Sequence, residues 1–127
     1  MSTTILIVDD ERDLLDPLRF AFERRGYRTV AVERGAAALA LIADPHCAPP
    51  AAILIDRMLP DMSGFEVVAA LRASPTTRGV PIIMVSACAE YRAPADLGLQ
   101  DYVTKPFRMS ALVERVAELL AGRAREA

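Results

Sequence analysis

The stretch ILIVDDERD, from Ile5 to Asp13, decides the fold. Four aliphatic residues run directly into three consecutive acids, Asp9, Asp10 and Glu11. A short run that is apolar on both faces is typical of a central strand in a parallel sheet, which helices cover on both sides. Because carboxylates repel one another and resist leaving water, acids at the end of such a strand call for a chemical reason.

Strand-like apolar runs alternate with helical patterns along the 127-residue chain. The runs cover residues 4–8, 28–32, 52–55, 82–85 and 102–104. Apolar residues spaced by three or four predict helices over residues 14–22, 36–43, 65–69 and 112–120. The first, third and fourth runs suit central strands and the mixed second run suits an edge. This alternation predicts an α/β fold, a doubly wound parallel sheet with helices on both faces.

Several residues mark the expected ends of these elements. Asp16 can cap a first helix that starts at Pro17, and Ser110 is the expected N-cap of the last helix. The segment CAEYRAPADLGLQ, residues 88–100, contains Pro94 and has room for about two helical turns, so we expect a shortened or irregular fourth helix there. We expect one domain over residues 1–127, with a core at about 3–121 and a polar tail, 122–127, that frays.

The composition excludes several classes of protein. Hydrophobic residues make up 53% of the chain, which excludes a disordered segment, and the net charge of −2 gives no basic field for nucleic acid or anionic lipid. No apolar run reaches the ~20 residues of a membrane span, and we find no signal peptide. Cys47 and Cys88 lack the spacing of a metal or redox motif and are expected to be free thiols, and His46 is expected in a surface loop. We therefore expect a cytoplasmic domain that binds neither nucleic acid nor membrane directly.

Polar residues follow the predicted strands at the point where each one ends. A doubly wound sheet places its site outside the carboxyl ends of the strands. The residues found there are Asp9, Asp10, Asp56, Ser86 and Lys105. Each alone has an ordinary interpretation, as a helix cap, a turn residue, a strand end or a solvated lysine. Their joint occurrence at the ends of different strands favours a functional site.

The chemistry of this set points to a divalent cation and a phosphate. Clustered carboxylates raise one another's pKa, and a bound cation removes that conflict. Oxygen ligands without histidine or thiolate suit Mg²⁺, for which Mn²⁺ can substitute. Mg²⁺ commonly binds one or two carboxylates together with phosphate oxygens. The hydroxyl of Ser86 and the ammonium of Lys105 supply the hydrogen bond and the charge that a phosphate needs.

Four motifs together resemble the receiver domain of two-component response regulators. They are VDDE after the first strand, LIDRMLPDMSG around the third, MVSA at the end of the fourth and DYVTKPF at the fifth. Their order and spacing fit that family over essentially the whole chain. The resemblance implies a flavodoxin-like sheet of order 2-1-3-4-5, which spacing alone does not establish. It also implies a phosphorylation-dependent signalling switch.

The resemblance assigns roles to the residues around the third strand. Asp56 matches the phosphoacceptor. Asp10 matches a direct Mg²⁺ ligand, Asp9 a ligand that acts directly or through water, and the backbone carbonyl of Met58 the remaining protein ligand. Gly64 matches the glycine that relieves a tight backbone turn in the loop after the acceptor.

The resemblance also assigns roles at the fourth and fifth strands. Ser86 and Lys105 would hold oxygens of the phosphoryl group, and the Lys105–Pro106 bond matches the family's cis peptide. Tyr102 matches the aromatic residue that changes rotamer when the domain is activated. With Ser86 drawn to the phosphate, Tyr102 could fill the vacated space, so these two residues are the expected switch.

The implied partners are other proteins. The phosphoryl donor would be a phosphohistidine on a sensor histidine kinase or a phosphotransfer protein. The output partner is not specified, a phosphorylation-dependent homodimer is left open, and the domain could stand alone or belong to a longer regulator. We expect no enzyme in the ordinary sense, only its own phosphoryl transfer and slow self-dephosphorylation. Slow loss is expected because Met58 and Cys88 match the two positions that, in the family, flank the path of the hydrolytic water, and neither side chain orients water well.

Two other classes of protein fit this sequence less well. A Mg²⁺-dependent phosphohydrolase with an aspartyl nucleophile, of the haloacid-dehalogenase type, needs a D-x-D motif at the first strand, whereas this chain has adjacent acids there and no room for a cap domain. A flavin-binding module needs a phosphate loop after the first strand, where Asp9 and Asp10 would repel the phosphate of FMN.

Overall fold

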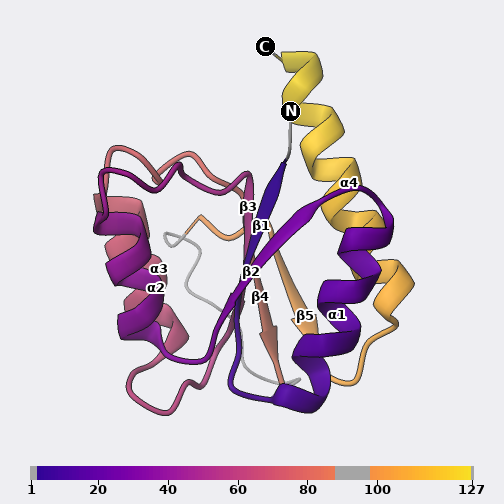
Figure 1. Ribbon diagram of the computed structural model, residues 1–127, viewed down its shortest axis with the longest axis horizontal. Coiled ribbons are helices and arrows are strands. Elements are labelled where there is room, and N and C mark those ends of the chain that lie inside the picture. Colours follow the sequence, from indigo (N-terminus) through magenta and orange to yellow (C-terminus); the bar gives the residue numbers. More distant parts are fainter. Residues whose placement is uncertain (1–2, 88–97, 127) are drawn as a thin grey trace.

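A computed structural model describes residues 3–87 and 98–126 and contains, within them, a five-stranded sheet and four helices (Figure 1). The strands are β1 (Thr4–Val8), β2 (Arg28–Val32), β3 (Ala52–Asp56), β4 (Ile82–Ser86) and β5 (Asp101–Thr104). The helices are α1 (Arg12–Arg24), α2 (Gly35–Ala43), α3 (Gly64–Ala73) and α4 (Met109–Glu126). The predicted alternation of strands and helices is therefore confirmed.

The sheet is parallel throughout, with the strand order β2-β1-β3-β4-β5. This confirms the expected doubly wound, flavodoxin-like topology. The three inner strands, β1, β3 and β4, consist almost wholly of buried residues, whereas β2 is mixed and lies at an edge, as predicted. The prediction of a shortened or irregular fourth helix falls mainly on residues 88–97, which lie outside the described residues.

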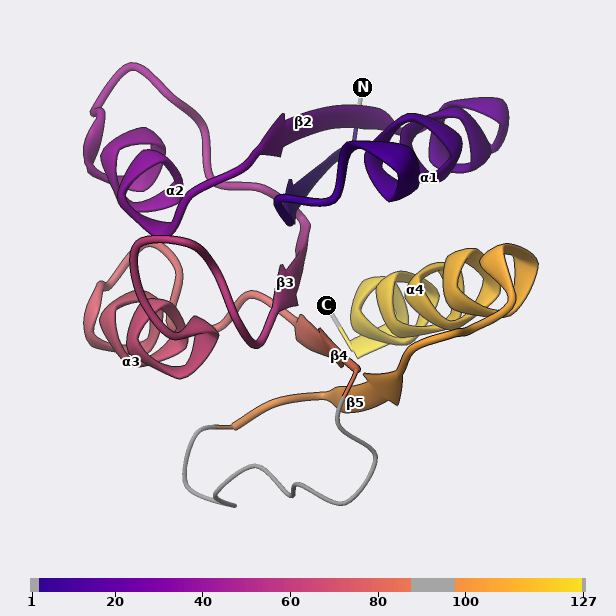
Figure 2. The ribbon, with the colours of Figure 1, turned by 90° about the horizontal axis from the view of Figure 1, so that it is seen from below.

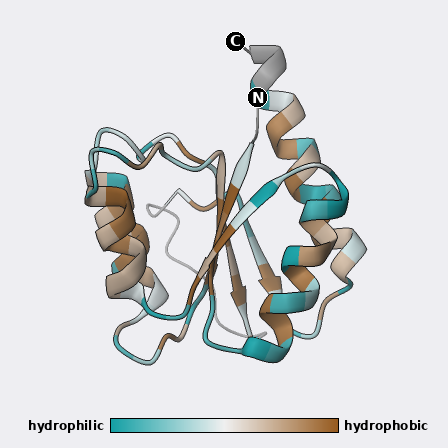
Figure 3. Cartoon of the chain, viewed as in Figure 1, coloured by the Kyte–Doolittle hydropathy of each residue, from teal (hydrophilic) through white to brown (hydrophobic). Residues whose placement is uncertain are grey.

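Two apolar clusters form the core, one on each face of the sheet. In Figure 2, α1 and α4 cover one face and α2 and α3 cover the other. The side chains of β1 alternate between them: Ile5 and Ile7 join the α1–α4 side, and Leu6 and Val8 the α2–α3 side. Figure 3 shows the strands as mostly apolar, while α1 carries hydrophilic and apolar residues on different sides. Within the described part of the chain, no helix has the length and apolar character that crossing a membrane requires.

The first helix starts earlier than the sequence suggested. The amide N–H groups of Leu14 and Leu15 both donate to the carbonyl of Glu11 at 3.0 Å, so α1 begins at Arg12. Pro17 lies inside the helix on an exposed position, and Asp16 is not its cap. The physical reason is that the buried stripe of α1 starts with Leu15, ahead of the proline.

The last helix also differs from the expectation at both ends. Its first turn closes on Arg108, whose carbonyl accepts the N–H of Leu112 at 3.1 Å, so Ser110 lies within the helix instead of capping it. Phe107 and Met109 pack against the core beside α1 and fix this earlier start. The helix continues to Glu126, so the tail expected to fray is helical up to that residue.

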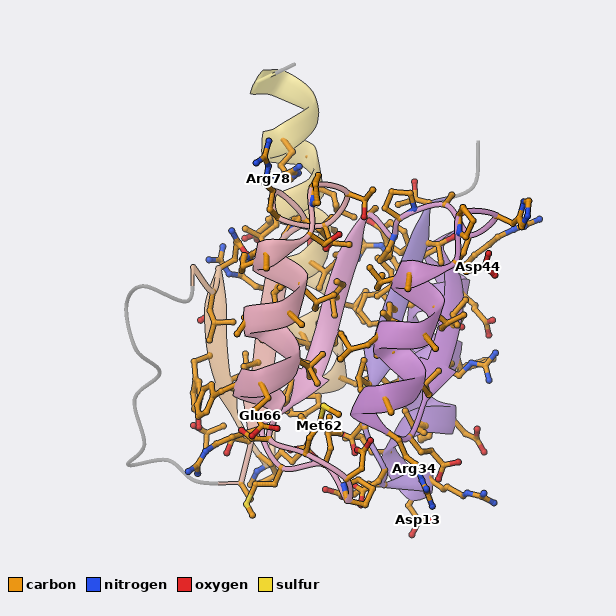
Figure 4. The ribbon with its side chains drawn as sticks, turned by 90° about the vertical axis from the view of Figure 1, so that its left-hand side faces the viewer. Asp13, Arg34, Asp44, Met62, Glu66 and Arg78 are labelled. Carbon is orange, nitrogen blue, oxygen red and sulfur yellow. The ribbon has the colours of Figure 1, made fainter. Side chains whose placement is uncertain are left out.

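A residue from a distant loop caps α2. The N–H groups of Gly35 and Ala36 donate to Oδ1 and Oδ2 of Asp61, both at 2.9 Å. Beside this cap, a Cβ atom at Gly35 would lie 2.6 Å from Cγ of Met62, so any larger residue would force the Met62 side chain to shift. Figure 4 shows Met62 at the same edge of the molecule as Arg34, which precedes α2. The loop between β3 and α3 is thus fastened to the start of α2.

We expect Asp61→Asn to lower the stability of the fold near neutral pH. The amide N–H groups of Ala36 and Gly35 hold the pKa of the Asp61 carboxyl below its ordinary value. A depressed folded-state pKa gives stability that is fully present above the unfolded pKa of about 3.9 and is lost as the pH falls through the folded pKa. The difference in urea midpoint between wild type and Asp61→Asn should therefore be largest near pH 7 and shrink below about pH 4.

The matched control is Asp44→Asn, because Asp44 accepts the N–H of His46 through a single oxygen, Oδ1, which asparagine can replace. An Asp61→Asn protein as stable as wild type at every pH would contradict the assigned cap.

Candidate functional site

The register of the sheet brings the predicted site residues to one edge. The paired positions there are Val8 with Ile55, Asp56 with Val85, and Ser86 with Thr104. Asp9 directly follows β1 and Lys105 directly follows β5. All of them lie at the carboxyl ends of the strands, the lower edge of the sheet in Figure 1.

The ammonium of Lys105 lies among three carboxylates. Its Nζ is 3.1 Å from Oδ2 of Asp9, 3.0 Å from Oδ2 of Asp56 and 2.6 Å from Oε1 of Glu11. The side chains of Asp9 and Asp56 are 5% and 10% exposed, while that of Glu11 is 57% exposed. The two aspartates are therefore buried, whereas the carboxylate of Glu11 is largely exposed to solvent.

Burial and charge shift the protonation equilibria of this cluster. Burial raises the pKa of Asp9 and the nearby charge of Asp56 adds to it, although the N–H of Glu11 and the contact with Lys105 act in the opposite direction. Burial alone would lower the pKa of Lys105, but its hydrogen bonds to Glu11, Asp56 and Asp9 outweigh this and raise it. Lys105 is thus held firmly in its charged form beside acids that outnumber it.

The loop after Asp56 is shaped by two backbone contacts. The N–H of Met58 donates to Oδ1 of Asp56 at 3.1 Å, which leaves Oδ2 to Lys105. The N–H of Gly64 donates to the carbonyl of Arg57 at 2.6 Å. A Cβ atom at Gly64 would overlap the carbonyl oxygen of Asp56 and lie 2.9 Å from Cα of Arg57. The glycine is therefore required by close approach of two backbone segments.

Ser86 and Tyr102 lie on neighbouring strands. Ser86 is the last residue of β4, is 2% exposed, and accepts the N–H of Lys105 on its carbonyl at 2.7 Å. Tyr102 lies two residues before the end of β5 and packs, half-buried, against the cluster on the α2–α3 side. The Lys105–Pro106 peptide bond is cis, as the resemblance implied.

A cleft of about 450 Å³ opens above these residues. It is lined by Asp10, Glu11, Asp56, Arg57, Met58, Ser86, Ala87 and Lys105. Asp10 and Met58 are both exposed in this lining, whereas Asp9 is buried and does not line the cleft. Cys88 lies outside the described residues. His46 and Cys47 are exposed in the loop before β3, which joins that strand at its opposite end.

Sequence reasoning assigned no role to Glu11. The expected cation ligands were Asp9, Asp10, Asp56 and the carbonyl of Met58. In the structure the carboxylate oxygens within 4.8 Å of one another belong to Asp9, Glu11 and Asp56. One feature of the sequence could have indicated a role for Glu11. It is the last residue of the acidic run, and its side chain is long enough to reach Lys105.

The donor set fits a hard divalent cation. The cluster offers carboxylate oxygens and includes neither histidine nor thiolate among the described residues of the cleft. Oxygen ligands of this kind suit Mg²⁺, Mn²⁺ or Ca²⁺ more than zinc or copper. Because the three acids exceed the charge of Lys105, a second positive charge would relieve their repulsion.

Fold and site together define a class: a doubly wound α/β domain whose acidic, lysine-bridged cleft lies at the carboxyl edge of its sheet. Residues 5–117 match the family described as the response regulator receiver domain. The chain belongs to this family, whose members carry phosphorylation-dependent signalling in two-component systems.

Curated relatives support this assignment over most of the chain. The sensory transduction protein RegX3 of Mycobacterium tuberculosis is 40% identical over 121 residues, which cover 93% of this chain and 51% of that protein. The transcriptional regulatory protein KdpE of the same organism is 38% identical over 117 residues, 90% of this chain and 49% of that protein. The chain thus spans about half the length of these relatives.

Solved structures agree with the fold. A CheY-like response regulator receiver domain protein from Methanospirillum hungatei superposes with a TM-score of 0.85 at 27% identity, covering 100% of both chains. The receiver domain of the sensor histidine kinase PA1611 from Pseudomonas aeruginosa superposes with a TM-score of 0.81 at 26% identity, covering 95% of this chain and 99% of that one. The latter structure has a magnesium ion coordinated in its active site cleft.

We expect Gly64→Ala to destabilise the protein by about 1–3 kcal/mol, because the added methyl forces the backbone of Asp56 and Arg57 to move. Urea unfolding monitored by circular dichroism measures this loss. Gly79→Ala is the matched control, since a Cβ there has no atom within 4 Å. Equal stability of the two variants would contradict the close approach described above.

Proposed function

We propose that Asp56 is the phosphoacceptor of this receiver domain and that Lys105 and Ser86 hold the phosphoryl group it receives. One observation carries this proposal: Oδ2 of Asp56 lies 3.0 Å from the Lys105 ammonium at the base of an acidic cleft. The ammonium is a charge-assisted hydrogen-bond donor for a phosphoryl oxygen, and Ser86, whose hydroxyl can donate a further hydrogen bond, lines the same cleft.

The reaction is an in-line displacement at phosphorus. A carboxylate oxygen of Asp56 forms a P–O bond while the P–N bond of a phosphohistidine breaks, and the electron pair of that bond stays on the departing imidazole. The product is an acyl phosphate on Asp56. Because phosphoryl transfer depends mainly on positioning and charge neutralisation, the chain contributes chiefly a fixed nucleophile and the positive charge of Lys105.

We propose that Asp9, Asp10 and Asp56, together with the carbonyl of Met58, hold a Mg²⁺ ion, which Mn²⁺ can replace. When bound, the ion neutralises charge on the phosphoryl oxygens. The observation that supports this is the excess of carboxylates over the one ammonium that contacts them. Catalysis by the domain would then be limited to its own phosphoryl transfer and slow self-dephosphorylation.

The proposed donor is the phosphohistidine of a sensor histidine kinase or a phosphotransfer protein, and the proposed compartment is the cytoplasm. The new phosphate carries about −1.5 to −2 charges. Ser86 and Lys105 would move toward it, and Tyr102 on β5 would follow into the space beside β4. The output surface would therefore be the face formed by β4 and β5.

The output of the proposed switch is the control of an effector. Because the relatives are about twice as long and KdpE is a transcriptional regulator, we propose that this receiver controls a separate effector, which is a partner protein or a domain in the same polypeptide. A Mg²⁺-dependent phosphohydrolase is not favoured, because the family match covers residues 5–117. Sustained release of p-nitrophenol from p-nitrophenyl phosphate would favour that alternative.

We expect the wild-type protein, incubated with Mg²⁺ and acetyl phosphate, to gain about 80 Da, the mass of one phosphoryl group. Asp56→Asn should gain none, and EDTA should abolish the gain. Asp61→Asn is the matched control in the same loop and should still be phosphorylated. Intact-protein mass spectrometry makes the measurement, and chromatographic size with beryllofluoride tests for a dimer. A mass gain retained in Asp56→Asn would disprove the proposed acceptor.

We further expect the acyl phosphate to hydrolyse slowly. Met58 is 72% exposed at the wall of the cleft, and its thioether is a weak hydrogen-bond acceptor that cannot orient an attacking water. Met58→Asn supplies an amide at this position and should accelerate the decay severalfold, as followed by loss of phosphorylated mass after the donor is removed. Met58→Leu, which is as apolar as methionine, should decay like wild type. Equal decay in wild type and Met58→Asn would contradict this explanation.

A further inference from the structure

Glu11 differs from the other two partners of Lys105. A lysine ammonium has three N–H donors, and in this structure Asp9, Asp56 and Glu11 each lie within hydrogen-bond distance of it. The contact with Glu11 is the shortest, at 2.6 Å, yet Glu11 is the partner most exposed to solvent. The side chains of Asp9 and Asp56 are buried, whereas Glu11 contacts the lysine from the solvent-exposed side.

The backbone of Glu11 is fixed while its side chain is directed at Lys105. Its N–H donates to Oδ1 of Asp9 at 2.8 Å, and its carbonyl accepts the first hydrogen bonds of α1. Although Glu11 is the N-cap residue of α1, its side chain makes no capping hydrogen bond. The carboxylate contacts instead a lysine 94 positions further along the chain.

We propose that Glu11 is a positioning residue that occupies one N–H donor of Lys105, keeps this donor from the incoming phosphoryl group and so slows phosphorylation of Asp56. This inference rests on the proposed role of Asp56. To bind a phosphoryl oxygen, Lys105 must release at least one of its three carboxylates. Glu11 is the partner that is released at least cost, because an exposed ion pair contributes little free energy and is screened by salt.

Two substitutions separate the contact from the charge. Glu11→Gln keeps the length of the side chain and one oxygen acceptor but removes the charge. Glu11→Asp keeps the charge but shortens the side chain by about 1.5 Å, one carbon–carbon bond, which breaks a 2.6 Å contact. Glu33→Gln is the matched control, because Glu33 follows β2 at the same edge of the sheet and pairs with Arg12.

The chain contains a single lysine, so labelling with ¹⁵N-lysine gives one ammonium signal, that of Lys105. In metal-free protein at fixed pH, we expect its protons to exchange with water faster in Glu11→Gln and Glu11→Asp than in wild type or Glu33→Gln. With Mg²⁺ and acetyl phosphate at constant ionic strength, both Glu11 variants should be phosphorylated about two- to fivefold faster, the effect expected when one exposed ion pair is lost.

Three results would overturn the inference. A faster reaction in Glu11→Gln alone would assign the effect to net charge, and a slower reaction with weaker Mg²⁺ binding in both variants would make Glu11 a cation ligand. If both Glu11 variants show the same proton exchange at Lys105 as wild type, while wild type is phosphorylated normally, the positioning role is refuted and the role of Asp56 is left intact. If wild type gains no phosphoryl group, the proposed function itself fails, and the rate argument with it.

Discussion

The site depends on one ammonium shared by three carboxylates. Without the charge of Lys105, Asp9 and Asp56 would be two like charges buried side by side, which is a costly arrangement. The same contacts join the ends of β1, β3 and β5, so they also fasten the carboxyl edge of the sheet. Since three acids exceed one cation, the arrangement that stabilises this edge also leaves it receptive to a further positive charge.

Much of this arrangement follows from local sequence. The strand from Thr4 to Val8 is apolar at every core position, because alternate side chains enter clusters on opposite faces of the sheet. A strand of that kind must be central and parallel, and in a parallel sheet the residues after central strands meet at one edge. Asp9, Asp56, Ser86 and Lys105 could therefore be grouped before their positions were known.

The remaining contacts depend on paths that local patterns do not encode. Glu11 reaches Lys105 across 94 positions, and Asp61 caps a helix that begins 26 positions earlier. Both contacts require a particular loop path and side-chain conformation, and neither leaves a periodic signal. The start of α4 shows the same limit on a smaller scale. Serine is a favoured N-cap residue, so Ser110 was a reasonable expectation. Phe107 and Met109 pack against the core, however, and α4 begins before Ser110.

The fixed parts of the molecule determine where a new charge on Asp56 could cause movement. On one side of Asp56, Asp61 fastens the loop to α2 and Gly64 binds the backbone of Arg57. At the opposite end of the sheet, the guanidinium of Arg72 donates to the carbonyls of Val80 and Gly98, both at 2.8 Å, which fixes the entries to β4 and β5. Within the described part of the chain, the carboxyl end of β5 is a place where a long side chain can exchange partners without disturbing the core. Lys105 lies there, and one of its three carboxylate partners, Glu11, is largely exposed to solvent, where an ion pair contributes little free energy.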